Sequence, residues 1–219
     1  MSLKCAQELS DAHVDVMGYA CLVAIMSMGR GYHCVSEVNL HQETIANDFP
    51  TPIVTSAGAL INGLKVLGAK QISIITPYMR PLTDMVVDYI EHQGIKVKES
   101  IALEIPDNLE VAAQNPMNLL EIYKQLDLTD VDVLVVSACV QMPSLEAIDL
   151  IQAECGIPVT SAAVCTTYEM MKKLGIEAKG FLNSFWPFTY VLNTAFSFSL
   201  INEYLISYPI FSQPFISMY

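Results

Sequence analysis

The sequence predicts an α/β protein built on parallel sheets. Between Val14 and Gly175, short apolar segments alternate with segments of helical pattern. The apolar segments are continuous and β-rich, as strands covered on both faces should be. Strand–helix repetition of this kind implies right-handed crossovers and parallel pairing. The expected strands are Val14–Ala20, Pro52–Thr55, Gln71–Thr76, Ile95–Glu99, Val131–Ala138 and Pro158–Ser161.

Proline and glycine mark the ends of the expected helices. A proline near the first turn and a glycine after the last turn are typical of helix ends. Each of the four patterns is followed at once or closely by a glycine: Gly68, Gly94, Gly156 and Gly175. The expected helices are Ser56–Leu67, Pro81–Gln93, Pro143–Glu154 and Ala162–Leu174.

Composition excludes several classes of function. The net charge of −12 over 219 residues argues against nucleic acid or an anionic membrane surface as a partner. The six cysteines form no CxxC pair, and the polar start shows no cleavable signal peptide, so a reduced cytoplasmic setting is expected. The four histidines show no spacing of metal ligands, so no zinc site is expected.

Two cysteines occupy matching places in two similar units. Residues 14–26 read VDVMGYACLVAIM and residues 131–143 read VDVLVVSACVQMP, so Cys21 and Cys139 each follow an apolar run. Ligands of parallel sheets lie outside the carboxyl ends of the strands, where both thiols fall. Amides that begin the next helix favour a thiolate there and bind anions. Two such thiols can act as nucleophile and proton donor, or as two opposed bases.

A lone cysteine is more often a small buried hydrophobe than a reactive group. That interpretation holds for the four cysteines on helix-like segments, and only the repeated context of Cys21 and Cys139 argues against it. The four are Cys5, Cys34, Cys155 and Cys165.

Motifs around both thiols resemble those of maleate cis–trans isomerase, a family of the aspartate/glutamate racemase superfamily. YACLVA, TPY, IPDN and SACVQMPS occur in this order, and the resemblance covers roughly residues 1–180. It implies two flavodoxin-like lobes with the site between them, no cofactor, a small dicarboxylate substrate and a homodimer. It further implies that Cys21 is the nucleophile and Cys139 the proton donor.

The same resemblance assigns the residues that bind substrate. Tyr78 and Asn108 match side chains that contact it, although alone they suggest a loop-closing aromatic residue and a helix cap. Backbone groups of four further residues match positions that line the site: Leu22, Val23, Val140 and Gln141. In the implied reaction Cys21 adds to the double bond of maleate, Cys139 protonates the neighbouring carbon, and elimination after rotation gives fumarate.

Two alternatives stay open at this stage. A racemase of the superfamily would use both thiols to exchange an α-proton, but its usual Asn-Thr after a catalytic cysteine is replaced here by Leu-Val and Val-Gln. The other alternative is a non-catalytic, truncated or membrane-tethered relative. A family member would begin with a further strand–helix segment, whose Pro-Ser-Ser-Asn-like loop contacts substrate.

The expected domains follow from this comparison. Residues 1–69 with 157–180 would form a first, incomplete lobe, and residues 70–156 a second. Residues 181–219 form an aromatic-rich, hydrophobic tail outside the family pattern, whose only charge is Glu203. Polar residues within the tail and the lack of a basic anchor argue against a membrane span there.

Overall fold

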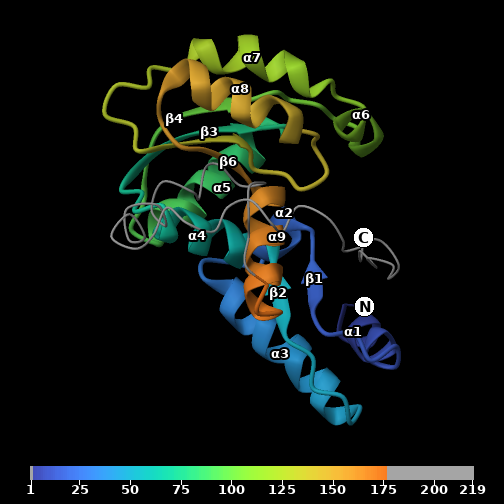
Figure 1. Ribbon diagram of the computed structural model, residues 1–219. Coiled ribbons are helices and arrows are strands. Elements are labelled where there is room, and N and C mark those ends of the chain that lie inside the picture. The colour runs from blue at the N-terminus through green and yellow to red at the C-terminus, as the bar shows by residue number, and fades with distance from the viewer. Residues whose placement is uncertain (1, 177–219) are drawn as a thin grey trace, which may run out of the picture.

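The computed structural model describes residues 2–176 and shows an α/β fold with parallel sheets (Figure 1). In this part of the chain six strands form two sheets, one in the order β1-β2 and the other in the order β4-β3-β5-β6. Every pair runs parallel. The strands are β1 (Met17–Tyr19), β2 (Ile53–Thr55), β3 (Gln71–Thr76), β4 (Lys96–Ala102), β5 (Val133–Ser137) and β6 (Val159–Ser161).

Helices connect these strands and cover them. The longer ones are α1 (Ser2–Ser10), α3 (Tyr32–Ala46), α4 (Ser56–Val66), α5 (Arg80–His92), α8 (Leu145–Cys155) and α9 (Ala162–Lys173). Shorter ones are α2 (Leu22–Met26), α6 (Asn108–Ala112) and α7 (Leu119–Ile122), with 3-10 turns at Pro116–Asn118 and Tyr123–Gln125. Gly68, Gly94, Gly156 and Gly175 lie at positive φ, as their predicted place after a helix requires.

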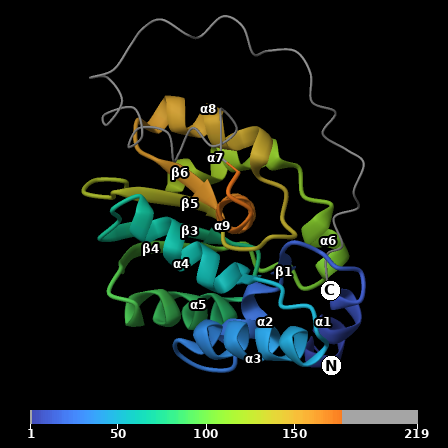
Figure 2. The same cartoon turned by 60° about the horizontal axis from the view of Figure 1, so that its bottom comes forward.

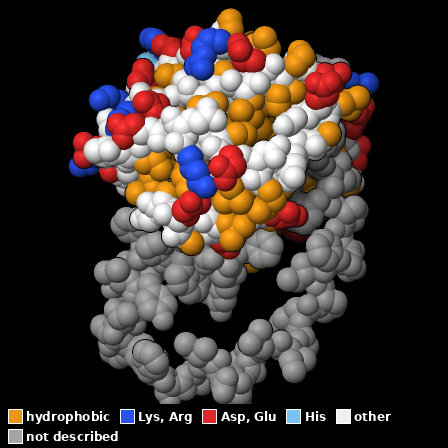
Figure 3. Space-filling model, turned by 90° about the horizontal axis from the view of Figure 1, so that it is seen from above, with side chains coloured by type: hydrophobic (Ala, Val, Ile, Leu, Met, Phe, Trp, Pro, Cys, Tyr) orange, Lys and Arg blue, Asp and Glu red, His pale blue; other side chains and the backbone are white. Residues whose placement is uncertain are grey.

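The four-stranded sheet carries most of the core. Helices α4 and α5 cover one face and α7 and α8 the other, as the two ribbon views show (Figures 1 and 2). The inner strands are apolar throughout because both faces are covered. Ile72, Ile74, Val133 and Val135 are fully buried. Seen from the side of α7 and α8, hydrophobic patches alternate with charged groups, and α8 leaves Leu145 and Leu150 half exposed (Figure 3).

The two-stranded sheet lies beside this core. Strand β1 pairs with β2 in the register Tyr19↔Thr55, and α3 packs on β2 and on α1. Helix α9 packs on α4 and also contacts both strands of this sheet. A Cβ on Gly18 would lie 3.0 Å from the Met170 sulfur, so a side chain there would require Met170 to shift by a few tenths of an ångström where α9 crosses β1.

All six predicted strands are present, with ends that differ by a few residues from the prediction. The strand that pairs with β6 differs from the prediction. The sequence assigned this strand to the first lobe, but Leu134 and Val135 of β5 pair with Val159 and Thr160 of β6 in the other sheet. The helix that follows, α9, does pack against α4. Residues 159–161 are therefore part of the four-stranded sheet, and the division into lobes otherwise stays a prediction.

The predicted tail at 181–219 lies outside the described residues, as do residues 177–180 of the predicted first lobe. Among the helices of residues 2–176, none combines the length and the apolar character that crossing a membrane requires.

Candidate active site

Cys21 lies at the carboxyl end of β1. Ala20 separates it from the strand, and Cys21 then takes the N-cap position of α2 with extended φ and ψ of −107° and 93°. Its side chain makes no capping hydrogen bond and is partly exposed. The first amides of a helix have no partner within the helix, so Leu22 and Val23 direct free N–H groups to this end of the strand. The sulfur is therefore available for chemistry.

Cys139 occupies the equivalent place after β5, with Ala138 between it and the strand. The hydroxyl of Ser137 donates to the Cys139 carbonyl at 2.8 Å, and the Cys139 amide donates back to that hydroxyl at 3.3 Å. The Ser137 hydroxyl also lies 3.4 Å from the Met142 carbonyl. One buried serine thus holds the whole turn. Cys139 is only 9% exposed, which makes its surroundings much drier than those of Cys21.

Tyr78 lies beside the turn that carries Cys139. It follows β3, and its hydroxyl donates to the carbonyl of Ala138 at 3.1 Å. Burial raises the pKa of Tyr78 far above its usual value, and hydrogen bonding with the Cys139 side chain and the charges of Cys139 and Cys21 raise it further. The phenol therefore lies beside one thiol, is within electrostatic reach of the other, and stays protonated.

A phenol has one hydrogen to donate, and Tyr78 gives it to the Ala138 carbonyl at 3.1 Å. Ala138 directly precedes Cys139, so this hydrogen bond fixes the phenol against the turn that carries the buried thiol.

Asn108 lies at the start of α6, but it is not the cap of that helix. Asp107 caps it, with its carboxylate accepting from the Leu109 amide at 2.6 Å. The side chain of Gln141, two residues after Cys139, donates to the Asn108 carbonyl at 2.8 Å. The loop that carries Asn108 is therefore tied directly to the turn that carries Cys139.

The remaining predicted residues lie in these same two turns. Leu22 is buried in the core, whereas Val23, Val140 and Gln141 are half-buried. Within residues 2–176, the amides of Val140 and Gln141 donate to no other group. They are free to donate to a ligand, and their assignment to substrate binding stays a prediction.

The sequence did not single out Tyr19, Ser137 or the side chain of Gln141. Tyr19 is the last residue of β1 and lies two residues before Cys21. Burial raises its pKa, and the nearby thiol of Cys21 raises it further. Tyr19 could have been predicted from its place two residues before Cys21 in the GYAC stretch. The roles of Ser137 and Gln141 depend on the shape of their turn, which the sequence pattern does not specify.

No group of three or more His, Cys, Asp or Glu side chains suited to a metal ion occurs in the part of the chain that the structure describes. The groups predicted for this site are two thiols, a phenol and backbone amides. They can carry out nucleophilic addition and proton transfer.

Known proteins resemble the chain closely. A family model described as arylmalonate decarboxylase matches residues 3–182. The maleate isomerase of Geobacillus stearothermophilus is 55% identical over 174 residues, which cover 80% of this chain and 69% of that protein. The chain belongs to the maleate isomerase family. Its fold class and its membership of an enzyme family, both expected from the sequence, are confirmed.

Solved structures of maleate isomerases match the fold. A cysteine-to-alanine variant of the enzyme Iso from Pseudomonas putida S16, solved with maleate, has a TM-score of 0.82 at 56% identity. The match covers 84% of this chain and 74% of that one. A cysteine-to-serine variant of the Nocardia farcinica maleate cis–trans isomerase carries a covalently bound succinylcysteine intermediate. It matches with a TM-score of 0.78 at 39% identity, over 80% of this chain and 71% of that one.

Proposed function

We propose that this chain isomerises maleate to fumarate without a cofactor, through a succinyl-cysteine intermediate on Cys21. The succinylcysteine in the Nocardia farcinica relative carries most of this proposal. That adduct formed in a protein in which another cysteine is serine, so one thiol bonds to carbon while a second has a different task. Here Cys21 is the more exposed thiol, whereas Cys139 is buried and directly follows Ala138, whose carbonyl accepts from Tyr78.

The proposed reaction balances without an external reagent. The Cys21 thiolate adds to one alkene carbon of maleate, and the electron pair of the π bond takes the proton of Cys139 at the neighbouring carbon. The bond between these carbons is now single and rotates. Cys139 then removes a proton from the same carbon, the double bond re-forms, and Cys21 leaves as thiolate. Covalent addition replaces one difficult rotation by two easier steps.

The substrate carboxylates need donors at both ends of the site. The free amides after Cys21 and Cys139 supply them on the two strand ends. Negative charge grows on the carboxylate next to the protonated carbon during addition, so donors fixed in place stabilise that step. We assign Tyr78 and the Asn108 side chain to substrate contacts within the same proposal.

The test is an NMR assay of the purified chain with maleate, in which fumarate is expected. Cys21→Ala should abolish the reaction, whereas Cys34→Ala, which changes an exposed thiol on α3, is the matched control. After quenching, mass spectrometry should find a succinyl-sized adduct on Cys21. Racemisation of aspartate or glutamate without fumarate would instead support the racemase. Neither reaction would favour the non-catalytic alternative.

The proposal includes a reduced cytoplasmic location and a homodimer. All six cysteines are unpaired, which suits a reducing compartment. Fractionation of cells and sedimentation of the purified chain test these two points separately from the activity.

A further inference from the structure

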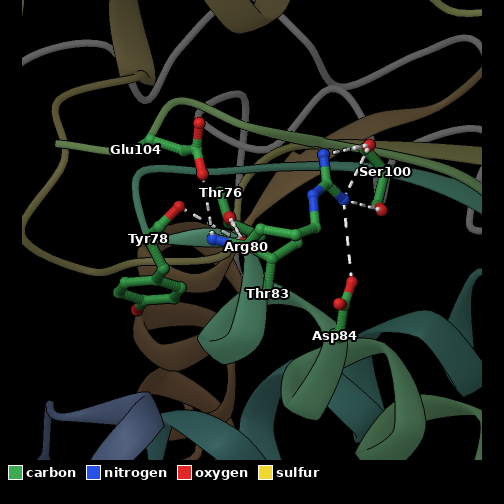
Figure 4. Close-up of polar contacts among 7 residues, drawn as sticks. All are labelled: Thr76, Tyr78, Arg80, Thr83, Asp84, Ser100 and Glu104. Atoms are coloured by element: carbon green, nitrogen blue, oxygen red, sulfur yellow. Dashed lines mark hydrogen bonds and ion pairs between the residues drawn. The ribbon is translucent and has the colours of Figure 1, made fainter.

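Two threonines hold the peptide of Tyr78 from inside the protein. Thr76, at the end of β3, and Thr83, on the first turns of α5, are both fully buried. Their hydroxyls lie 2.6 Å apart, and that of Thr83 also donates to the Tyr78 carbonyl at 3.4 Å (Figure 4). Either threonine hydroxyl can donate in the 2.6 Å contact, and a carbonyl can only accept, so Thr83 is the donor toward Tyr78. The three groups form one chain of hydrogen bonds.

The turn at Glu104 holds the same peptide from the other side. The Glu104 amide donates to the Tyr78 carbonyl at 3.2 Å, and the Ile105 amide donates to the Pro77 carbonyl at 2.9 Å. The Glu104 carboxylate accepts from the Arg80 amide at 3.4 Å (Figure 4). Arg80 begins α5, whose N-cap residue Met79 has no capping side chain, so Glu104 supplies the missing cap from outside the helix.

Glu104 adopts a backbone conformation that side chains disfavour. Its φ is 54°, in the left-handed region. Such residues persist where the surroundings fix them, and they concentrate near functional sites. The contacts that fix Glu104 are those to Tyr78 and Arg80, which makes the strain part of the structure that holds Tyr78.

We propose that Thr83 and Glu104 are positioning residues for Tyr78. They fix its main chain so that the phenol reaches the Ala138 carbonyl, next to Cys139. The catalytic meaning of this inference rests on the proposed function, but the geometric part does not. Displacement of a reacting group by about 1 Å can cost about a hundredfold in rate, so these indirect contacts should be visible in the kinetics.

The Thr83 hydroxyl is tested in the full chain by Thr83→Val, which keeps the shape, and Thr83→Ser, which keeps the hydroxyl. We expect kcat for maleate to fall about tenfold in the valine variant, with a smaller change in KM, and the serine variant to recover most of it. The control is Thr166→Val, which removes an equally buried hydroxyl that donates only within α9, to Ala162 at 2.6 Å. It should leave kcat unchanged.

A second measurement does not depend on turnover. Without maleate, the rate at which iodoacetamide alkylates Cys139 is followed by peptide mass spectrometry. Tyr78→Phe removes the hydrogen bond that holds the phenol against the turn of Cys139 and sets the reference, and Thr83→Val should raise the rate in the same direction by about fivefold. Thr166→Val should not. If neither the parent chain nor any variant forms fumarate, the proposed function fails. The alkylation rates still decide whether Thr83 positions Tyr78.

Glu104 keeps the inference testable if Thr83→Val does not fold. Glu104→Ala removes the carboxylate from the start of α5 but keeps the amide. Its control is Asp130→Ala, since Asp130 is also exposed and has a φ of 58° but lies in another turn. We expect alkylation of Cys139 to rise about threefold only in the Glu104 variant. Rates equal to the control, for either Thr83 or Glu104, would show that the residue does not position Tyr78.

Discussion

Replacement of Tyr78 by phenylalanine removes one oxygen atom from the centre of the site. The lost hydroxyl donates to the Ala138 carbonyl at 3.1 Å, in a partly buried place next to Cys139. A neutral hydrogen bond contributes about 1 kcal/mol net, and a carbonyl left without its donor costs about 1–3 kcal/mol. We therefore expect the variant to lose about 1–2 kcal/mol of stability. For a chain of this size each kcal/mol lowers Tm by about 2–4 °C.

The effect of the same change on activity should be much larger than its effect on stability. A fixed polar group beside the reacting atoms contributes about a hundredfold or more to kcat. Steady-state fumarate formation measures this, with the folded fraction checked by near-ultraviolet circular dichroism. If Tyr78→Phe retained the parent kcat while losing the expected stability, the phenol would be a structural group only, and its assignment to the site would be refuted.

The raised pKa of Tyr78 also predicts how stability depends on pH. Its folded pKa lies above the unfolded value of about 10, so the folded chain keeps a proton that the unfolded chain loses. The stabilisation is complete below pH ~10 and declines as pH rises beyond that value. Chemical denaturation at several alkaline pH values should show a shallower decline in Tyr78→Phe than in the parent chain.

Three other outcomes are expected. Cys139→Ser should lower kcat severely, because a serine hydroxyl is a far weaker acid, yet leave an adduct on Cys21; an adduct only on Cys139 in the parent chain would reverse the two roles. Gly58→Ala should destabilise by about 1–3 kcal/mol in urea unfolding, because its Cβ would lie 2.6 Å from the Glu37 carboxylate; a gain in stability would show that Glu37 moves freely. Burial lowers the pKa of His33, so stability should fall as pH drops below its unfolded value near 6.5, and His33→Gln should remove that slope.

The positions of the thiols could be predicted because they depend on local pattern. An apolar strand followed by a helix start places the intervening residues at a sheet edge, whatever the rest of the fold does. The same holds for β3, whose predicted bounds Gln71–Thr76 match the observed ones. The contact of Tyr78 with Ala138 could not be read from the pattern, because it joins residues 60 positions apart in the sequence.

Two other features, the sheet that β6 joins and helix α3, were not predicted correctly from the sequence, and the physical reasons can be identified. The sheet that β6 joins was predicted wrongly because a strand of only three residues, Val159–Ser161, carries too little pattern to choose between the two sheets, and only packing decides. Helix α3 was not predicted because its pattern is inverted. It buries His33 and Ser36, while Val35 and Val38 are half exposed or more. A polar cluster covers part of that face, since His33 bonds to the Tyr89 hydroxyl at 2.5 Å.

The crossing of α9 over β1 has a consequence for how the chain is made. The strand that leads to Cys21 is synthesised long before Met170, which covers Gly18 of that strand. Parallel pairing and helix cover of this kind join distant segments, which form late in folding. During translation the segment around Cys21, the proposed nucleophile, therefore remains without the packing of α9 on its strand, while most of the protein emerges from the ribosome. Oxidants and electrophiles in the cell can reach it in that interval more easily than at any later time.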